Sequence, residues 1–247
     1  MREKICRFFF ESRIFMMILI LIVFCGVTVT TVVTHQSFLR VLPLYVSIWV
    51  YFFQSKVSRY GALIGSLNSI LYGFVYLYYN LYGSAISAFL VSLPLQLITF
   101  IMWSKHSYKH STVFRKMSPK MRLLTALGSI VAYVVYVFVM KNSDANYLYL
   151  DSIIMISGII VPVLTLFAFV EYAYVSMFTA PVSVLMYVLL AIKTPEQLPY
   201  LIFNIYSCVC CTRQLYNARS LFSEQQSADK PSSVEIIEIK AYKEINK

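Results

Sequence analysis

The sequence has little charge and few of the glycines and prolines that mark turns. Only 13% of its 247 residues are Asp, Glu, Lys or Arg, and it contains 7 glycines and 8 prolines. Soluble globular proteins have about 25% charged and about 45–50% apolar residues, whereas 59% of this chain is hydrophobic. This balance excludes a soluble domain, a disordered chain, a collagen-like fibre and a disulfide scaffold. It is typical of a protein that crosses a membrane several times.

The sequence also lacks the motifs of an enzyme or an ATP-driven pump. There is no glycine-rich phosphate loop. The three histidines (His35, His106 and His110) lie in loops or at the edges of apolar stretches, and we interpret each as a surface residue. We therefore predict no catalytic residue, no cofactor and no metal site.

Eight apolar stretches approach the length of a transmembrane helix, which needs about 20 residues. They are Ile14–Val33, Phe38–Phe53, Tyr60–Tyr79, Gly83–Trp103, Leu123–Met140, Ser152–Val170, Tyr174–Leu190 and Leu198–Cys211. The second and the eighth are short and weaker. The sequence predicts an all-α polytopic membrane protein with eight transmembrane helices.

The lysines and arginines favour one orientation of these helices. With eight helices, 18 of the 21 basic residues lie on the side of the two termini, and only Arg40, Lys141 and Lys193 lie on the other. Basic residues concentrate in cytoplasmic loops, so we predict that both termini are cytoplasmic. The net charge of +10 then follows from topology. We expect the basic loop 104–122 to face lipid headgroups, with no nucleic-acid partner.

Uneven loop lengths group the helices as 1 + 3 + 1 + 3. In the predicted orientation the two triple-helix units are parallel, which is a transporter architecture with the substrate held between the halves. The tail is rich in Ser, Gln, Lys and Glu, and is predicted to be disordered. The predicted segments are 1–37 with the first helix, 38–103 as the first repeat, 104–151 as basic loop and linker helix, 152–216 as the second repeat, and 217–247 as the tail.

The cores of the apolar stretches contain amides and hydroxyls but no Asp, Glu, Lys or Arg. Coupled carriers usually keep an intramembrane carboxylate, so its absence favours passive transport. Asn68, Gln96, Ser183 and Asn204 are the candidate polar residues, and each either lines a cavity or forms an interhelical hydrogen bond.

Two aromatic residues share a helix face with these amides. Tyr72 lies four residues after Asn68, and Trp103 seven after Gln96. An amide and a ring on adjacent helices would suit a flat heteroaromatic ligand.

The segment Tyr60–Tyr72, followed by Leu81-Tyr82-Gly83 and then Gln96 and Trp103, resembles the Pnu family of bacterial vitamin transporters. Members of that family transport nicotinamide riboside, thiamine or riboflavin. The resemblance implies a parallel 3 + 1 + 3 fold similar to that of SWEET proteins, with an extra first helix, assembled as a homotrimer in the bacterial plasma membrane. In the second half, Asp151, Ser152, Glu171, Ser183 and Tyr187 fall at positions comparable to those of the family pattern.

The chain departs from the family pattern at residues that hold the vitamin. A Trp-x-x-Trp-x-x-x-Asn/Asp motif usually follows the glutamate, but here those positions are Ala173, Ser176 and Ala180. A usual glutamine is Pro162, and a frequent tryptophan is Phe100. Loss of these groups would remove stacking and orientation, which indicates an altered substrate preference.

The leading hypothesis is a uniporter for nicotinamide riboside or a similar nucleoside, which a separate cytoplasmic kinase would trap by phosphorylation. Its predicted substrate-binding residues are Asn68, Tyr72, Gln96, Trp103, Ser183, Tyr187 and Asn204. The alternatives are a thiamine, riboflavin or nucleoside transporter of the same family, and a non-transporting membrane subunit or receptor.

Overall fold

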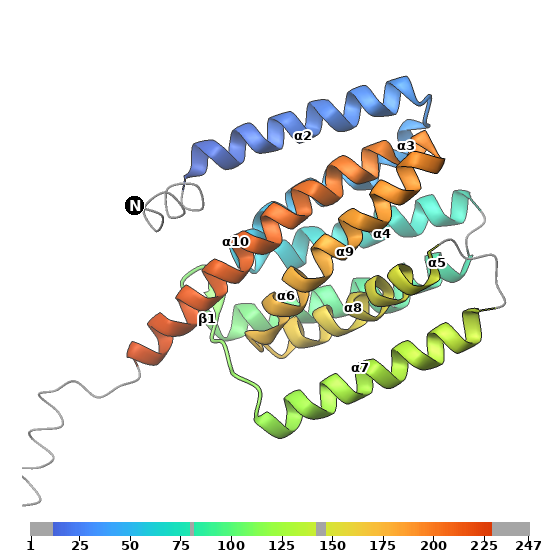
Figure 1. The fold of residues 1–247 in the computed structure, drawn as a ribbon. Coiled ribbons are helices and arrows are strands. Elements are labelled where there is room, and N and C mark those ends of the chain that lie inside the picture. Colours follow the sequence, from blue (N-terminus) through green and yellow to red (C-terminus); the bar gives the residue numbers. More distant parts are fainter. Residues whose placement is uncertain (1–11, 80–81, 142–146, 229–247) are drawn as a thin grey trace, which may run out of the picture.

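The computed structural model describes residues 12–79, 82–141 and 147–228 as a bundle of long helices (Figure 1). The helices are α2 (Arg13–Val33), α3 (Phe38–Ser55), α4 (Tyr60–Tyr78), α5 (Tyr82–Ser87), η1 (Ala88–Ser92), α6 (Leu93–Lys105), α7 (Pro119–Met140), α8 (Leu148–Leu166), α9 (Glu171–Lys193), η2 (Pro195–Gln197) and α10 (Leu198–Ala228). The strands β1 (Ser107–Tyr108) and β2 (Ser111–Thr112) form a small antiparallel hairpin.

The central helices form two groups of three. α4 packs against α3 and α6, and α9 packs against α8 and α10. The groups meet where α10 contacts α3 and where α6 contacts α8. α2 and α7 lie at opposite edges of the bundle in Figure 1, with α2 on α3 and α10 and α7 on α8.

Seven helical segments of the described chain are long and apolar enough to cross a membrane, and they coincide with the first seven predicted stretches. The eighth stretch, Leu198–Cys211, lies within α10 and is not among them. Its hydropathy is lowered by Asn204 and Ser207, which both line a cavity. The prediction of several membrane helices is therefore confirmed, although composition supports only seven of the eight.

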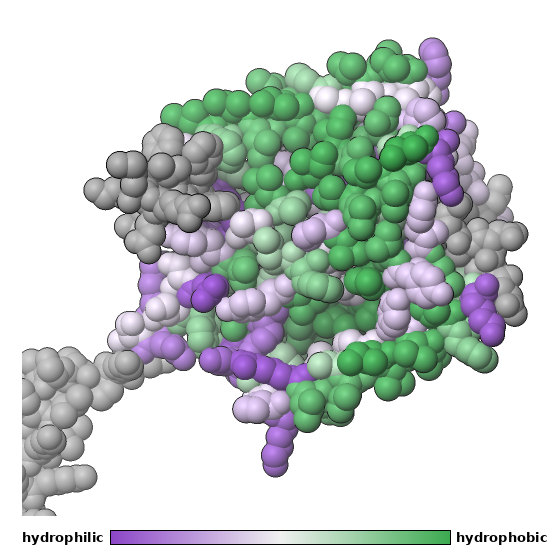
Figure 2. Space-filling view, viewed as in Figure 1, coloured by the Kyte–Doolittle hydropathy of each residue, from purple (hydrophilic) through white to green (hydrophobic). Residues whose placement is uncertain are grey.

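The outer surface of the bundle is apolar. Large hydrophobic side chains are exposed along α2 and α7, and α7 has no buried residue. In Figure 2 hydrophobic side chains cover much of the visible middle of the bundle, while hydrophilic ones gather towards its ends. This distribution matches a bundle whose flanks face lipid and whose ends face water.

The fourth predicted stretch is not one regular helix. Ala88–Ser92 forms a π-helical turn, η1, between α5 and α6. Pro94 lies two residues after this turn and has no N–H to donate to the carbonyl of Leu90, which weakens regular α-helical bonding at this place. Ser92, in this turn, lines the cavity described below.

The structure corrects the predicted disorder of the tail between residues 217 and 228, which continue α10 as a helix. Ala218, Leu221 and Gln225 lie on one face of that helix and are buried against the basic loop. The Gln225 side chain accepts a hydrogen bond from Phe114 N (2.9 Å) and donates one to Thr112 O (2.9 Å). Because this segment is mostly polar, its composition did not reveal that these three residues are buried. Residues 229–247, the remainder of the predicted tail, lie outside the described residues.

The basic loop is fixed to the bundle at several points. The backbone of Arg115 donates to Ala168 O (2.9 Å) and accepts from Val170 N (3.0 Å) in the α8–α9 turn. Lys109 Nζ donates to Glu224 Oε2 of α10 (2.6 Å), and this carboxylate raises the pKa of the ammonium group. The end of the bundle that holds this loop is called the basic end below.

Candidate functional site

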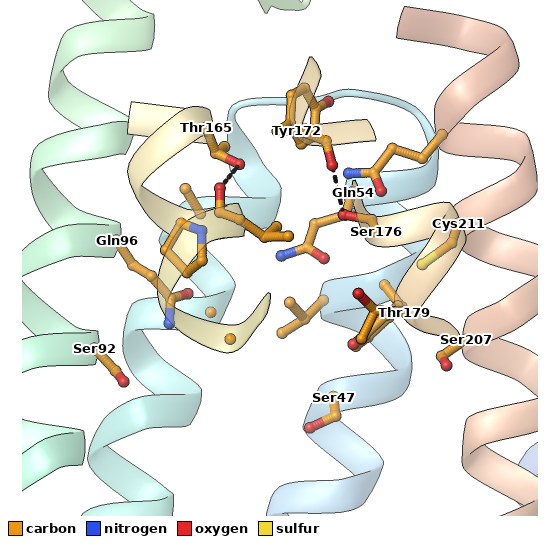
Figure 3. A pocket seen from close by; sticks show the side chains of 18 of the residues that line it. Ser47, Gln54, Ser92, Gln96, Thr165, Tyr172, Ser176, Thr179, Ser207 and Cys211 are labelled. Carbon is orange, nitrogen blue, oxygen red and sulfur yellow. Dashed lines mark hydrogen bonds between the residues drawn. The ribbon is translucent and has the colours of Figure 1, made fainter. Parts of the chain in front are cut away.

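A cavity of about 440 Å³ lies between the two helix groups. α3, α4, η1 and α6 form one wall, and α8, α9 and α10 form the other (Figure 3). None of the described residues that line it is charged. The polar and aromatic lining residues are Ser47, Tyr51, Gln54, Ser58, Asn68, Ser69, Tyr72, Ser92, Gln96, Thr99, Trp103, Ser157, Thr165, Tyr172, Ser176, Thr179, Ser183, Asn204, Ser207 and Gln214.

The structure brings six of the seven predicted site residues to this cavity. They are Asn68, Tyr72, Gln96, Trp103, Ser183 and Asn204. Tyr187 is not among the lining residues. Its ring instead stacks on Tyr200, with ring centroids 6.0 Å apart and planes 18° apart.

Asn68 lines the cavity and has one hydrogen-bond acceptor that is not used. Its Nδ2 donates to Ser47 Oγ (2.8 Å), and that hydroxyl lies 3.5 Å from the Tyr72 hydroxyl. Asn68 Oδ1 is buried and has no hydrogen-bond partner among the described residues. A buried acceptor without a partner is unfavourable, so a ligand that donates an N–H or O–H here would gain binding energy.

Gln96 reaches across from α6 to α4. Its Nε2 donates to Ser69 Oγ (3.0 Å), and the Ser69 hydroxyl lies 3.1 Å from Gly65 O. A Cβ atom at Gly65 would overlap the Gln96 side-chain oxygen. Glycine at position 65 therefore allows the amide to lie against the α4 backbone, where its polar edge faces the cavity.

Aromatic side chains lie at both ends of the cavity. At the basic end, Trp103 Nε1 donates to Thr165 O (2.9 Å), and the indole meets Phe114 edge-on at 5.7 Å. Phe114 stacks on Tyr172 at 6.1 Å. At the opposite end, Tyr72 stacks on Tyr76 at 5.6 Å. Ring faces of this kind stack on flat heteroaromatic ligands and attract cations.

The second-half wall is built from small residues whose polar groups bond within their own helix. Ser176 Oγ donates to Tyr172 O (2.9 Å) and Thr179 Oγ1 to Val175 O (2.9 Å). Asn204 Nδ2 donates to Tyr200 O (2.8 Å). Sequence reasoning missed most of the lining hydroxyls, although the three- and four-residue spacing of Ser176, Thr179 and Ser183 was a signal for one cavity-facing stripe.

The positions that depart from the family pattern are divided between this wall and the core. Pro162, Ser176 and Ala180 line the cavity, whereas Ala173 is fully buried in the hydrophobic core. Phe100 packs against Tyr60 at 6.3 Å. Tyr172, one position before Ala173, supplies an aromatic ring that the motif comparison did not identify.

The two acidic residues highlighted in the second half do not line the cavity. Glu171 accepts hydrogen bonds from Arg122 Nε (2.9 Å) and Nη2 (2.7 Å) at the basic end. Asp151 lies 3.5 Å from the Tyr136 hydroxyl. The cavity can therefore bind a ligand by stacking and neutral hydrogen bonds, without any Asp, Glu, Lys, Arg or His among its described lining residues.

Comparison with known proteins agrees with this architecture. The family described as nicotinamide mononucleotide transporter matches residues 37–213. The nicotinamide riboside transporter PnuC of Neisseria mucosa is 27% identical over 124 residues, which cover 48% of this chain and 46% of that relative. The match thus spans about half the length of the relative.

A solved structure shares the fold. The crystal structure of the vitamin B3 transporter PnuC superposes with a TM-score of 0.67 at 21% identity, covering 85% of this chain and 93% of the other. The matching family and this structural neighbour are transporters, which confirms the expectation that the chain is not an enzyme.

Proposed function

The chain belongs to the nicotinamide mononucleotide transporter family, and from this premise we propose that it transports nicotinamide riboside or a similar vitamin nucleoside by facilitated diffusion. The observation that supports this most is the uncharged cavity between the two helix groups, with amides on both walls and rings at both ends. Its volume of about 440 Å³ lies in the range of about 300–1,000 Å³ found for small-molecule sites.

The chemistry of the cavity fits a nucleoside better than a nucleotide. A nicotinamide ring and its carboxamide would match a stacking surface and the amides of Asn68 and Gln96, and ribose hydroxyls would match the serines and threonines. A phosphate group would be buried without a cation among the described lining residues, which is strongly unfavourable. The positive charge of the pyridinium ring would be stabilised by the neighbouring tyrosine and tryptophan faces.

Passive transport is supported by the same lining. A carrier coupled to protons or sodium usually has an intramembrane carboxylate as its coupling group. Glu171 and Asp151 are engaged elsewhere, and no described lining residue is acidic. The substrate would then accumulate only if a separate cytoplasmic kinase phosphorylated it.

The residues of the second wall that differ from the family pattern bear on which vitamin is transported. On that wall Ser176 stands where the family pattern has an indole, and Ala180 and Pro162 stand where it has polar side chains. This supports an altered preference, with thiamine, riboflavin or another nucleoside as the alternative substrates.

We also propose the finer topology and assembly. α10 would be the eighth membrane helix, since it packs against α2, α3 and α9 and its polar residues face the cavity. The arrangement would be 1 + 3 + 1 + 3 with parallel SWEET-like repeats, in a homotrimer in the bacterial plasma membrane. Both termini would be cytoplasmic, as the lysine and arginine distribution favours.

The test is uptake of labelled nicotinamide riboside into liposomes that contain only this protein and have no ion gradient. We expect saturable uptake that stops when the inner and outer concentrations are equal, and none in protein-free liposomes. Labelled thiamine, riboflavin and uridine are assayed in the same way. Uptake that requires a sodium or proton gradient would contradict the uniport mechanism. Absence of flux for all four compounds would contradict the proposed substrate class.

A further inference from the structure

A second hollow, away from the transport cavity, lies at the basic end of the bundle. It measures about 490 Å³ and is formed by the basic loop, the first turn of α7, the start of α9 and the last turns of α10. Its charged residues are Lys116, Arg122, Glu171 and Arg219.

The charges in this hollow do not cancel. Glu171 is engaged by Arg122, as described above, and also accepts from Met117 N (3.2 Å). Lys116 and Arg219 are exposed and have no carboxylate partner among the described residues. Arg219 lies over the Tyr174 ring, 5.7 Å from its centroid. The hollow therefore has two uncompensated positive charges, which suits a phosphate group.

An apolar crevice of about 480 Å³ lies between α7 and α8. The α7 side includes the small residues Gly128 and Ala132, and the α8 side includes Ile156 and Ile160. A Cβ atom at Gly128 would meet nothing within 4 Å, so the space is open. The Ser129 hydroxyl donates to Thr125 O (2.6 Å), which leaves the crevice surface apolar.

The hollow and the crevice share one face of α7. Arg122, Thr125, Ser129 and Ala132 follow one another at three- or four-residue spacing, which places them in one line along the helix. From Arg122 to Ala132 the helix rises about 15 Å, which is about half of the ~30 Å hydrocarbon thickness of a bilayer. A charged hollow followed by an apolar channel one leaflet deep has the dimensions of one phospholipid.

We propose that an anionic phospholipid binds at this place, with its phosphate near Lys116 and Arg219 and one acyl chain in the α7–α8 crevice. α7 contacts only α8 extensively, and none of its residues is buried. The lipid would fill the open side of this contact and hold α7 against the bundle. This inference does not depend on which substrate the transport cavity accepts.

The experiment compares lipid binding to the full chain by native mass spectrometry in a neutral detergent. Phosphatidylglycerol and phosphatidylcholine with identical acyl chains are the probes, and inorganic phosphate is added as a competitor. We expect at least about tenfold tighter binding of phosphatidylglycerol, since each basic residue near an anionic lipid contributes on the order of 1 kcal/mol. Equal binding of the two lipids, or displacement by millimolar inorganic phosphate, would overturn the proposal.

Two variants locate the lipid. The double variant K116Q/R219Q is expected to lose the preference for phosphatidylglycerol, whereas its matched control K105Q/K120Q, which removes the same charge outside the hollow, is expected to keep it. The variant Gly128→Leu fills open space in the crevice. We therefore expect it to fold and to bind both lipids more weakly. Unchanged preference in K116Q/R219Q would overturn the headgroup assignment. Disulfide cross-linking between copies through Ala132→Cys would show a protein interface in place of the lipid.

Discussion

The two walls of the transport cavity satisfy their polar groups in different ways. In the first half, side chains bond between helices, with Asn68 of α4 on Ser47 of α3 and Gln96 of α6 on Ser69 of α4. In the second half, Ser176, Thr179 and Asn204 bond to carbonyls of their own helices. The first wall is thus held by hydrogen bonds between its helices, whereas these polar side chains of the second wall are satisfied within single helices.

This difference separates two tasks. A network between helices pre-organises amide groups, so the ligand does not have to order them on binding. Small residues with locally satisfied hydroxyls can change without disturbing neighbouring helices. We infer that the first wall recognises the feature common to the substrates, and the second determines which substrate fits.

The largest effect is expected for Gln96→Ala. It removes the amide that spans α4 and α6, and loss of one buried hydrogen-bonding partner costs about 1–3 kcal/mol. Affinity for nicotinamide riboside, measured by isothermal titration calorimetry, should fall by about 10- to 100-fold at unchanged expression. Asn204→Ala in the second wall should change it by less than about threefold. Equal losses would remove the distinction between the walls.

A smaller effect is expected for Gly65→Ala. The new methyl group would displace the Gln96 side chain. The amide would still be present but misplaced, which weakens ligand binding less than removal of the amide does. We expect about tenfold lower affinity, corresponding to about 1.4 kcal/mol. The matched control is Gly158→Ala, which also lines the cavity but has open space at its Cβ. A stronger loss in the control than in Gly65→Ala would contradict this role of the first wall.

The smallest effect concerns stability. Asn68→Ala removes an interhelical hydrogen bond, and such bonds in membrane proteins contribute about 0.6 kcal/mol on average and at most about 1.7. The free energy of unfolding, measured by titration in mixed detergent, should fall by this amount. Ser176→Ala removes a bond within one helix turn and should leave the free energy of unfolding nearly unchanged. A larger loss for Ser176→Ala would place a stabilising network in the second wall as well.

The sequence was sufficient for the helices and for the family, because both depend on local patterns. Seven apolar stretches were located, and the order Asn68, Tyr72, Gln96, Trp103 identified one wall of the cavity. Helical periodicity placed each residue on a face but did not specify which side chain on the opposite helix it would meet. The Gln96–Ser69 bond and the close approach to Gly65 were therefore not predictable.

Other features were missed because their signal is weak in the sequence. Serines and threonines that line a cavity resemble those that bond within any membrane helix, so composition does not separate them. Residues 217–228 read as disordered because only Ala218, Leu221 and Gln225, on one face, are buried. Tyr187 follows Ser183 by four residues, but its ring lies against Tyr200 and not among the lining residues.

The length of α10 has a mechanical consequence. Its 31 residues span about 46 Å, well beyond the ~30 Å hydrocarbon layer, and it runs without interruption from the cavity wall to the Gln225 contact with the basic loop. A tilt of about 10° at the cavity displaces its far end by about 5 Å. A tilt of α10 caused by a ligand in the cavity would therefore move the basic loop by more than it moves the cavity wall, as a lever does.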